Sequence, residues 1–315
     1  MSLPKVSIVG AGQVRATTAH LLALKGLADL TLIDVVEGLA QGKALDLAQS
    51  APIEGFCAQV QGTTDYGAMA GSRLVILTAG LARKPGMSRE DLLAANANVV
   101  GPIVDRIAKL APEAAIIVVT NPLDIMVALA LRRSGFPRSR VMGMAGVLDT
   151  ARLRTVVAQR LHVAPVEVHA MVLGSHGDLM VPLKSSITVK GEPVTKWLRA
   201  DEIEQLLQRT KDGGAEIVAL LKQGSAFYAP ASGVVEMANA ILQDTHAVLP
   251  VCAWLQGEYG LRDVCIGVPA QLGAKGIERV VERPLSPEEH STLVASAEKV
   301  REGIRSFESL TLGAR

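Results

Sequence analysis

Short, almost uninterrupted apolar runs alternate with longer helical patterns through the first half of the chain. Between the runs, residues 13–26, 38–50 and 89–110 carry Ala, Leu and Lys at helical spacing. The runs have strand length and are VSIVG (6–10), LTLID (30–34), LVILTAG (74–80) and AIIVVTN (115–121). Such strands are buried on both faces, as in a parallel sheet covered by helices. The alternation predicts a doubly wound parallel sheet of the α/β class.

The pattern changes near residue 144. After a fifth short run, RVMGMAG (140–146), the order of predicted elements becomes mixed: a helix at 149–161, strand signals in EVHAMVLG (167–174) and ITVKGEPV (187–194), and helices at 200–222 and 230–243. We therefore predict two domains, 1–143 and 144–315, of which the second is α+β. No Pro/Gly/Ser-rich linker separates them, so we expect them to pack tightly.

Composition narrows the function classes. The 315 residues carry 32 Lys and Arg against 31 Asp and Glu, and only 3% are aromatic. Without a basic surplus or stacking aromatics, a nucleic-acid partner is not expected. No run of 18 apolar residues and no signal pattern is found, so we expect no membrane partner. Cys57, Cys252 and Cys265 lie far apart, which predicts reduced thiols, a cytoplasmic location and no metal site.

The turn after the first strand has the features of a phosphate-binding loop. In GAGQVR (10–15), Gly10 permits a tight turn, Gly12 lets the backbone approach a pyrophosphate, and the following helix offers free N–H groups. Asp34 ends the next strand, where an acidic residue can bind the adenosine ribose and repel a 2′-phosphate. The pattern predicts a Rossmann domain that binds NAD rather than NADP.

Arg15 occupies the place of the third glycine of this motif. That glycine normally allows the helix to pack closely on the strand. We expect the long Arg15 side chain to point outward, toward solvent or over the diphosphate, or else to push the helix away. Either outcome predicts weakened or altered cofactor binding, and equal NAD affinity of an Arg15→Gly variant would contradict it.

Three polar residues of the second half form a candidate catalytic set. His176 in GSHGD follows a strand-like run, where its ring could transfer protons near neutral pH. Asp149 and Arg152 are three residues apart and would share a helical face. A carboxylate can orient an imidazole, and an arginine can bind a substrate carboxylate through two hydrogen bonds. The alternatives are a structural loop histidine and an ordinary ion pair within a helix.

A basic loop, LARKPGMSRED (81–91), follows one of the predicted parallel strands. It holds Arg83 and Arg89 before a helix that Ser88 would cap, with Asp91 three residues on. Ligands of such sheets bind at the carboxyl ends of the strands. The loop is therefore a candidate ligand-binding element.

Together these motifs resemble the lactate/malate dehydrogenase family, and most closely its malate dehydrogenases of lactate-dehydrogenase-like type. The resemblance covers nearly the whole chain, because the motifs GAGQV, ARKPGMSR, VVTNPLD, GVLDTAR, GSHGD, YAPA and QGEYG stand in the family's order and spacing. It implies an NAD-dependent oxidoreductase that reversibly converts (S)-malate, a small dicarboxylate, to oxaloacetate, a reaction of the tricarboxylic acid cycle. It also implies a homodimer or homotetramer.

The resemblance assigns roles to five residues. His176 would accept the hydroxyl proton of malate, and Asp149 would orient it. Arg152 would bind the C1 carboxylate, and Arg89 would polarise the reacting carbonyl. Arg83 would bind the second carboxylate, at a position where lactate enzymes typically carry Gln.

Further residues are implied for the cofactor and the pocket. Asn121 would hydrogen-bond substrate and cofactor, and its bond to Pro122 is cis in relatives. Ala226 falls where relatives line the substrate pocket. The residues expected at the cofactor are Gly10, Ala11, Gly12, Gln13, Val14, Arg15, Asp34, Asn96, Val119, Thr120 and Asn121.

Two other functions stay open at this stage. The chain could be a lactate or other 2-hydroxyacid dehydrogenase, against which Arg83 argues. It could also be an NAD-binding homologue with impaired catalysis, because Arg15 interrupts the glycine motif.

Overall fold

The first half of the chain forms the predicted parallel sheet, in the order β3-β2-β1-β4-β5-β6. The structure is a computed structural model and describes residues 3–10, 12–81 and 88–312. Each neighbouring pair in this part of the sheet is parallel. The strands are β1 (Lys5–Val9), β2 (Asp29–Ile33), β3 (Val60–Thr63), β4 (Leu74–Leu77), β5 (Ala115–Val118) and β6 (Val141–Gly143). This is a Rossmann strand order, so the predicted fold class is confirmed.

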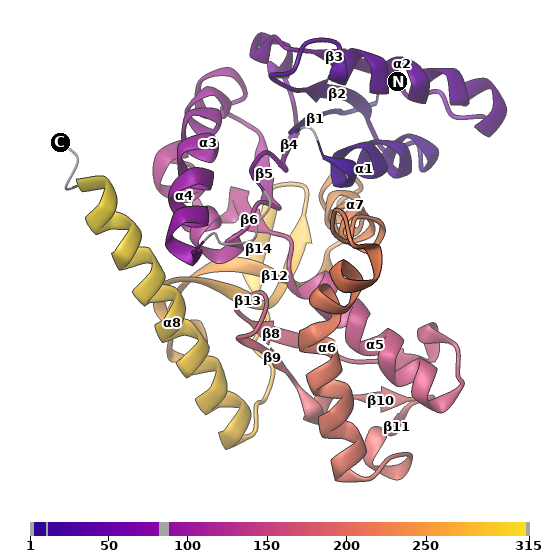
Figure 1. Ribbon diagram of the computed structural model, residues 1–315, viewed down its shortest axis with the longest axis vertical. Helices are drawn as coiled ribbons and strands as arrows, with labels where there is room; N and C mark the ends of the chain where they lie inside the picture. The colour runs from indigo at the N-terminus through magenta and orange to yellow at the C-terminus, as the bar shows by residue number, and fades with distance from the viewer. Residues whose placement is uncertain (1–2, 11, 82–87, 313–315) are drawn as a thin grey trace.

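Helices cover both faces of this sheet (Figure 1). The side chains of β4 point alternately into two apolar cores, one on each face of the sheet. Leu74 and Ile76 belong to the first core, and Val75 and Leu77 belong to the second. Because both faces are buried, the strand reads as a continuous apolar run. One core includes helices α1 (Gln13–Leu24), α2 (Leu39–Glu54) and α7 (Tyr228–Leu242). The other includes α3 (Arg89–Leu110), α4 (Leu123–Ser134) and α8 (Pro287–Leu312).

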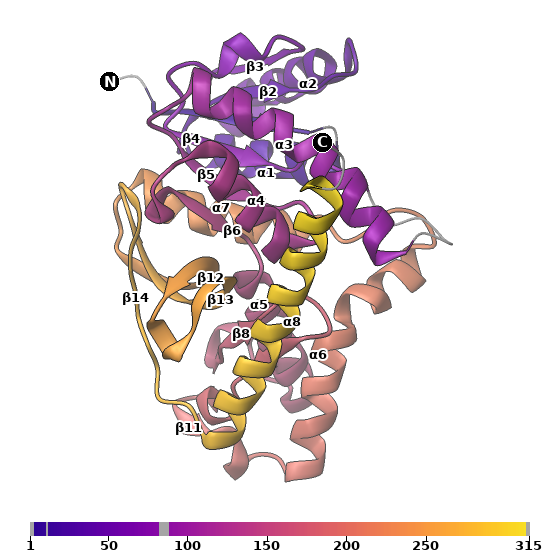
Figure 2. The ribbon, with the colours of Figure 1, turned by 90° about the vertical axis from the view of Figure 1, so that its left-hand side faces the viewer.

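The second half extends the same sheet with antiparallel strands. The long strands β12 (Ala247–Gln256) and β13 (Arg262–Gly273) pair with each other, and β12 also pairs with β6. Strands β8 (Val172–Gly174), β9 (Met180–Pro182) and β14 (Gly276–Val280) complete a sheet of eleven strands among the described residues. Figure 2 shows α8 running beside this region, where it packs on β13 and α4.

A smaller unit lies beyond the main sheet. It contains β7 (Val168–His169), β10 (Thr188–Val189) and β11 (Glu192–Pro193), with α5 (Gly146–Leu161) and α6 (Ala200–Leu221), and it has its own apolar core. The mixed α+β character of the second half was predicted from the sequence, whereas β3, β12, β13 and α8 were not. No helix among the described residues is long and apolar enough to cross a membrane.

Glycines stand at close contacts between neighbouring strands of the large sheet. Gly143 of β6 pairs with Cys252 of β12, and Gly267 of β13 pairs with Gly174 of β8. A Cβ atom on Gly267 would lie 2.6 Å from the carbonyl oxygen of Gly174. The two halves of the chain meet in the pairing of β6 with β12, where a Cβ atom on Gly143 would lie 3.0 Å from the Cβ atom of Cys252. The boundary between residues 143 and 144 stays a prediction, because one sheet runs across it.

Candidate active site

The phosphate-loop glycine, which follows β1, lies against the carboxyl ends of β2 and β4. Gly10 adopts a φ of 126°, and a Cβ on it would lie 2.6 Å from the backbone nitrogen of Ala79. Its own N–H donates to the carbonyl of Ile33 at 3.1 Å. Only glycine can bring the turn this close to the neighbouring strand.

The residues present fit a dinucleotide diphosphate. Helix α1 begins at Gln13 with Gly12 as its N-cap, and no side chain caps it. A Cβ built on Gly12 meets nothing within 4 Å, so the space before the helix N-terminus is open. The unbonded N–H groups and the positive end of the helix dipole favour an anionic group there. Val14 follows in the first turn, and the expected contact Ala11 lies outside the described residues.

Arg15 does not point outward, and that prediction is wrong. Its side chain is fully buried, with Nη1 donating to Asp34 Oδ2 at 2.8 Å and to the carbonyl of Ile33 at 3.2 Å. Burial lowers the pKa of Arg15, and the charge and hydrogen bond of Asp34 oppose that shift. The inward direction is possible because the end of β2 supplies both a countercharge and a carbonyl acceptor.

Asp34 therefore differs from the free ribose acceptor expected from the sequence. Its side chain is 2% exposed, and its Oδ1 accepts from the N–H of Val36 at 3.0 Å. Its other oxygen holds Arg15. The diphosphate turn fits the cofactor, while the carboxylate for the adenosine ribose is already engaged.

His176, Asp149 and Arg152 come together as predicted from the sequence. His176 Nδ1 lies 2.9 Å from Asp149 Oδ2, and Arg152 Nη1 lies 3.4 Å from Asp149 Oδ1. Asp149 sits in the first turn of α5 with its side chain 2% exposed. Burial lowers the pKa of His176, but the Asp149 charge and hydrogen bond, with a smaller contribution from Asp124, raise it above its ordinary value.

A second carboxylate, Asp124, holds the backbone of the loop that carries His176. The sequence alone does not identify this residue. Its Oδ2 accepts from Ser175 Oγ at 2.6 Å and from the backbone N–H of His176 at 3.1 Å. Ser296 Oγ accepts the N–H of Ser175 at 2.9 Å. Burial raises the pKa of Asp124. The only sequence signal was an acid two residues after Asn-Pro, in the first turn of a helix, a position that the helix dipole alone also favours.

The Asn96 side chain joins helix α3 to the loops that follow β4 and β5. Its buried side chain donates to the carbonyls of Leu81 at 3.1 Å and Asn121 at 2.6 Å, and accepts from the N–H of Leu81 at 2.6 Å. These bonds tie α3 to the ends of β4 and β5. Thr120 Oγ1 donates to the carbonyl of Ala79 at 2.6 Å. Of the expected cofactor contacts, these two are thus engaged in holding the loops together.

Asn121 and His176 line one hollow of about 360 Å³, together with residues of α3 and α8. The peptide bond from Asn121 to Pro122 is cis, as the resemblance implied. Val119 continues β5 through a bond from its N–H to the carbonyl of Leu77. Ala226 lies half-buried between α6 and α7. The hollow lies at the carboxyl end of the parallel strands, where the loops of both halves meet.

Part of the basic loop falls outside the described residues. Arg83 is among those outside, and Arg89 begins α3 with a side chain that lies outside the description. The predicted cap of α3 is present, since Ser88 Oγ accepts from the N–H of Asp91 and the Asp91 carboxylate accepts from the N–H of Ser88. The helix that carries Arg89 therefore starts at the predicted residue.

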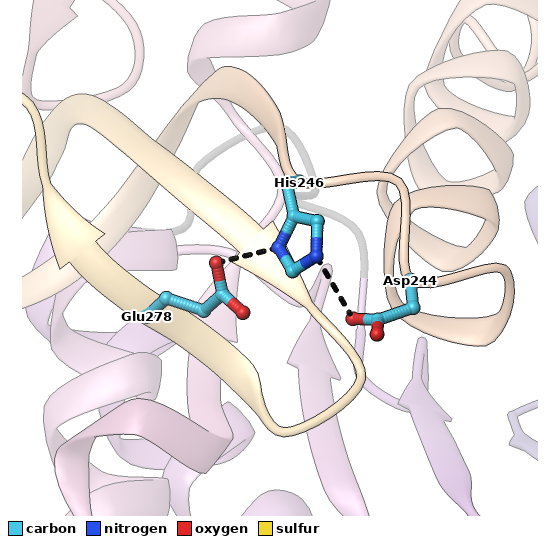
Figure 3. A group of neighbouring side chains, drawn as sticks. All are labelled: Asp244, His246 and Glu278. Atoms are coloured by element: carbon cyan, nitrogen blue, oxygen red, sulfur yellow. Dashed lines mark hydrogen bonds and ion pairs between the residues drawn. The ribbon is translucent and has the colours of Figure 1, made fainter.

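One group of described side chains could offer three ligand atoms to a cation, although no metal cluster was expected. Asp244, His246 and Glu278 point toward one another on the surface (Figure 3), with the ligand atoms within 4.8 Å of each other. The His246 ring already bonds Glu278 at 2.8 Å, which raises its pKa. None of the three lines the hollow beside His176. Sequence spacing could not show the group, because Glu278 belongs to a distant strand.

The sequence matches the models of two domains that belong to one protein family. Residues 4–143 match the "lactate/malate dehydrogenase, NAD binding domain" and residues 146–311 the "lactate/malate dehydrogenase, alpha/beta C-terminal domain". The chain belongs to the lactate/malate dehydrogenase family. Its first half is accordingly the NAD-binding part of that family's fold.

Relatives within the family cover almost the full length. A malate dehydrogenase of Thermomicrobium roseum is 52% identical over 98% of this chain and 99% of the relative, and one of Methanosarcina barkeri is 47% identical over 97% and 100%. Among solved structures, malate dehydrogenase from Salinibacter ruber has a TM-score of 0.94 at 44% identity, covering 99% of this chain and 100% of that one. A Cryptosporidium parvum lactate dehydrogenase complexed with lactic acid and NAD reaches 0.95 at 37%, covering 98% and 99%. The fold is thus common to both activities.

Proposed function

We propose that this chain is an NAD-dependent malate dehydrogenase, which reversibly oxidises (S)-malate to oxaloacetate. The observation that carries the proposal is the Asp149 carboxylate, which contacts His176 at 2.9 Å and Arg152 at 3.4 Å. One group thereby positions both a proton acceptor and a carboxylate receptor. The relatives of about 50% identity are malate dehydrogenases, which supports malate over lactate.

His176 supplies the proton transfer. Asp149 is an acceptor, so the neutral imidazole carries its hydrogen on Nδ1 and leaves the lone pair of Nε2 for the substrate hydroxyl. When the hydroxyl proton reaches Nε2, the resulting imidazolium is stabilised by the same carboxylate. Bound NAD would accept the hydride from C2, so that one proton and one hydride leave malate together.

Arg152 supplies the carboxylate receptor. Its Nη1 makes only the long contact to Asp149, and its Nε is buried with no partner among the described residues. Buried donors without partners are costly, and a substrate carboxylate would satisfy them. We assign Arg152 to the C1 carboxylate, and Asn121, which lines the hollow beside His176, to a hydrogen bond with the substrate.

We assign the diphosphate of the cofactor to the glycine-rich turn and the first turn of α1, namely Gly10, Gly12, Gln13 and Val14. We assign its nicotinamide half to the residues after β5, namely Val119, Thr120 and Asn121. The domains 1–143 and 144–315 would bind cofactor and substrate, respectively. We assign Arg89 to the reacting carbonyl. We assign Arg83 to the second carboxylate, because a substrate-binding arginine with no carboxylate to pair with would disfavour pyruvate.

The proposal is tested by the oxidation of NADH with oxaloacetate and with pyruvate. We expect oxaloacetate to be preferred in kcat/KM, and Arg83→Gln to shift the preference toward pyruvate. Preference of the wild-type chain for pyruvate would make it a lactate or other 2-hydroxyacid dehydrogenase. NADH binding without turnover of either substrate would make it the impaired homologue, and unchanged selectivity of Arg83→Gln would remove the role of Arg83.

We also propose that the chain works in the cytoplasm as a homodimer or homotetramer. Cys252 and Cys265 are buried free thiols and Cys57 is an exposed one, as in a reducing compartment. Large apolar side chains of α2 are exposed, namely Leu45 and Ile53, and a second copy could cover them. A monomer in sedimentation equilibrium at micromolar concentration would contradict the assembly.

A further inference from the structure

The buried pair Arg15–Asp34 lies where the adenosine ribose of a dinucleotide would meet the protein. Asp34 closes β2, and the Arg15 side chain reaches it from α1 with an Nη1–Oδ2 distance of 2.8 Å. Neither side chain is exposed by more than 2%. An acidic residue at this position excludes a 2′-phosphate by its negative charge. In this chain that charge is paired within the protein.

The surroundings of Asp34 carry more positive charge than they would with a glycine at position 15. Besides Arg15, the ammonium group of Lys43 on α2 lies within electrostatic reach. Its pKa is lowered by partial burial and by the charge of Arg15, and raised by that of Asp34. Two cations therefore act on one carboxylate. The Nε and Nη2 of Arg15 are buried and have no partner among the described residues, so its guanidinium keeps donors that an added anion could use.

Space is also available next to Lys43, although neither Arg15 nor Asp34 lines it. A cavity of about 340 Å³ between α1 and α2 is lined by Gln13, His20 and Lys43, with Asp46 as its one carboxylate among the described residues. A phosphate on the 2′-oxygen could be placed near this cavity. This phosphate would approach the Asp34 carboxylate, whose negative charge is largely neutralised by Arg15 and further opposed by Lys43.

We propose that Arg15 is a specificity-determining residue, which weakens the discrimination of this chain against NADP relative to NAD. The inference rests on the proposed function, because it assumes that a nicotinamide dinucleotide binds at Gly10–Gly12. Arg15 acts on both ligands. It occupies the Asp34 oxygen that would accept from the ribose hydroxyls of NAD, and it neutralises the charge that would repel NADP.

Direct binding tests this without turnover. Dissociation constants of NADH and NADPH are measured by isothermal titration calorimetry for the wild-type chain, Arg15→Gly and Arg15→Met. Removing Arg15 takes away one of the two cations that act on Asp34, and the one that is hydrogen-bonded to it, so the ratio of the NADPH to the NADH dissociation constant should rise by about tenfold or more. Lys25→Met removes one positive charge from the exposed end of the same helix region and should leave the ratio unchanged. Circular dichroism establishes that each variant is folded.

The outcomes separate the two proposals. A ratio that stays within about threefold of wild type in folded Arg15→Gly and Arg15→Met overturns the role of Arg15, while NADH binding itself still supports the proposed function. A rise of equal size in Lys25→Met would attribute the effect to net charge and also overturn it. If no variant binds either dinucleotide, the proposed function fails together with this inference.

Discussion

At the scale of the residue, the central feature is that Asp149 serves two neighbours. It holds the His176 ring in one tautomer and lies against Arg152. An Asp149→Asn variant keeps the shape but loses the charge. We expect kcat/KM to fall by about 10²–10⁴-fold, the usual contribution of a positioned acid or base.

The pH profile of the same variant gives a second test. Malate oxidation needs neutral His176, so in the wild-type chain its rate should fall as the pH drops through the raised pKa of His176. Without the Asp149 charge, burial dominates and lowers that pKa, so the acid limb should move to lower pH. Asp263→Asn, an exposed change of the same charge, should not move it. An unmoved limb in Asp149→Asn would show that another group titrates.

Some side-chain contacts of the site could be predicted from the sequence alone, and others could not. His176, Asp149 and Arg152 could be predicted to meet because short motifs with fixed chemistry carry them. The direction of Arg15 could not, since it depends on Asp34, which is 19 residues away in the chain. The role of Asp124 was hidden for the same reason, because Ser175 lies 51 residues from it. Side-chain partners across elements are set by tertiary packing, which local patterns do not encode.

At the scale of the element, Asp124 links the start of α4 to the end of β8. Asp124→Leu would leave the Ser175 hydroxyl and the His176 N–H without an acceptor, so we expect a loss of about 2–4 kcal/mol in the free energy of unfolding. Asp124→Asn keeps an oxygen acceptor and removes a buried charge, and should cost less than about 1 kcal/mol. Urea denaturation at neutral pH compares the two. Equal losses would mean that shape, and not hydrogen bonding, matters at this position.

Elements differ in how visible they are in the sequence. The parallel strands could be located because burial on both faces produces continuous apolar runs, as in β4 and β5. Strand β12 contains Pro250, which is unusual in a central strand, and one of its two partners, β6, lies about 100 residues earlier in the chain, so no local signal marks β12 as central. Helix α8 buries Leu293, Ala297, Val300 and Ile304 at helical spacing, so its pattern was present in the sequence.

At the scale of the whole molecule, the contact between β13 and β8 depends on glycine. In Gly267→Ala the new methyl group would meet the Gly174 carbonyl oxygen at 2.6 Å, and backbone cannot move away as a side chain would. We expect a loss of about 1–3 kcal/mol in the free energy of unfolding. Gly42→Ala, where the new methyl group meets nothing within 4 Å inside α2, should instead gain about 0.5–1 kcal/mol. Thermal melts of both variants should move in opposite directions, and parallel shifts would refute the importance of this contact.

The pairing of β6 with β12 also has a consequence for synthesis on the ribosome. Gly143 is made about 100 residues before Ala247, where β12 begins, an interval of about 5–20 s at ordinary translation rates. During that time the far side of β6 has no strand to pair with, although the first six strands are complete. A nascent chain of this protein therefore presents an open, apolar strand edge for seconds, which is the kind of surface that chaperones bind.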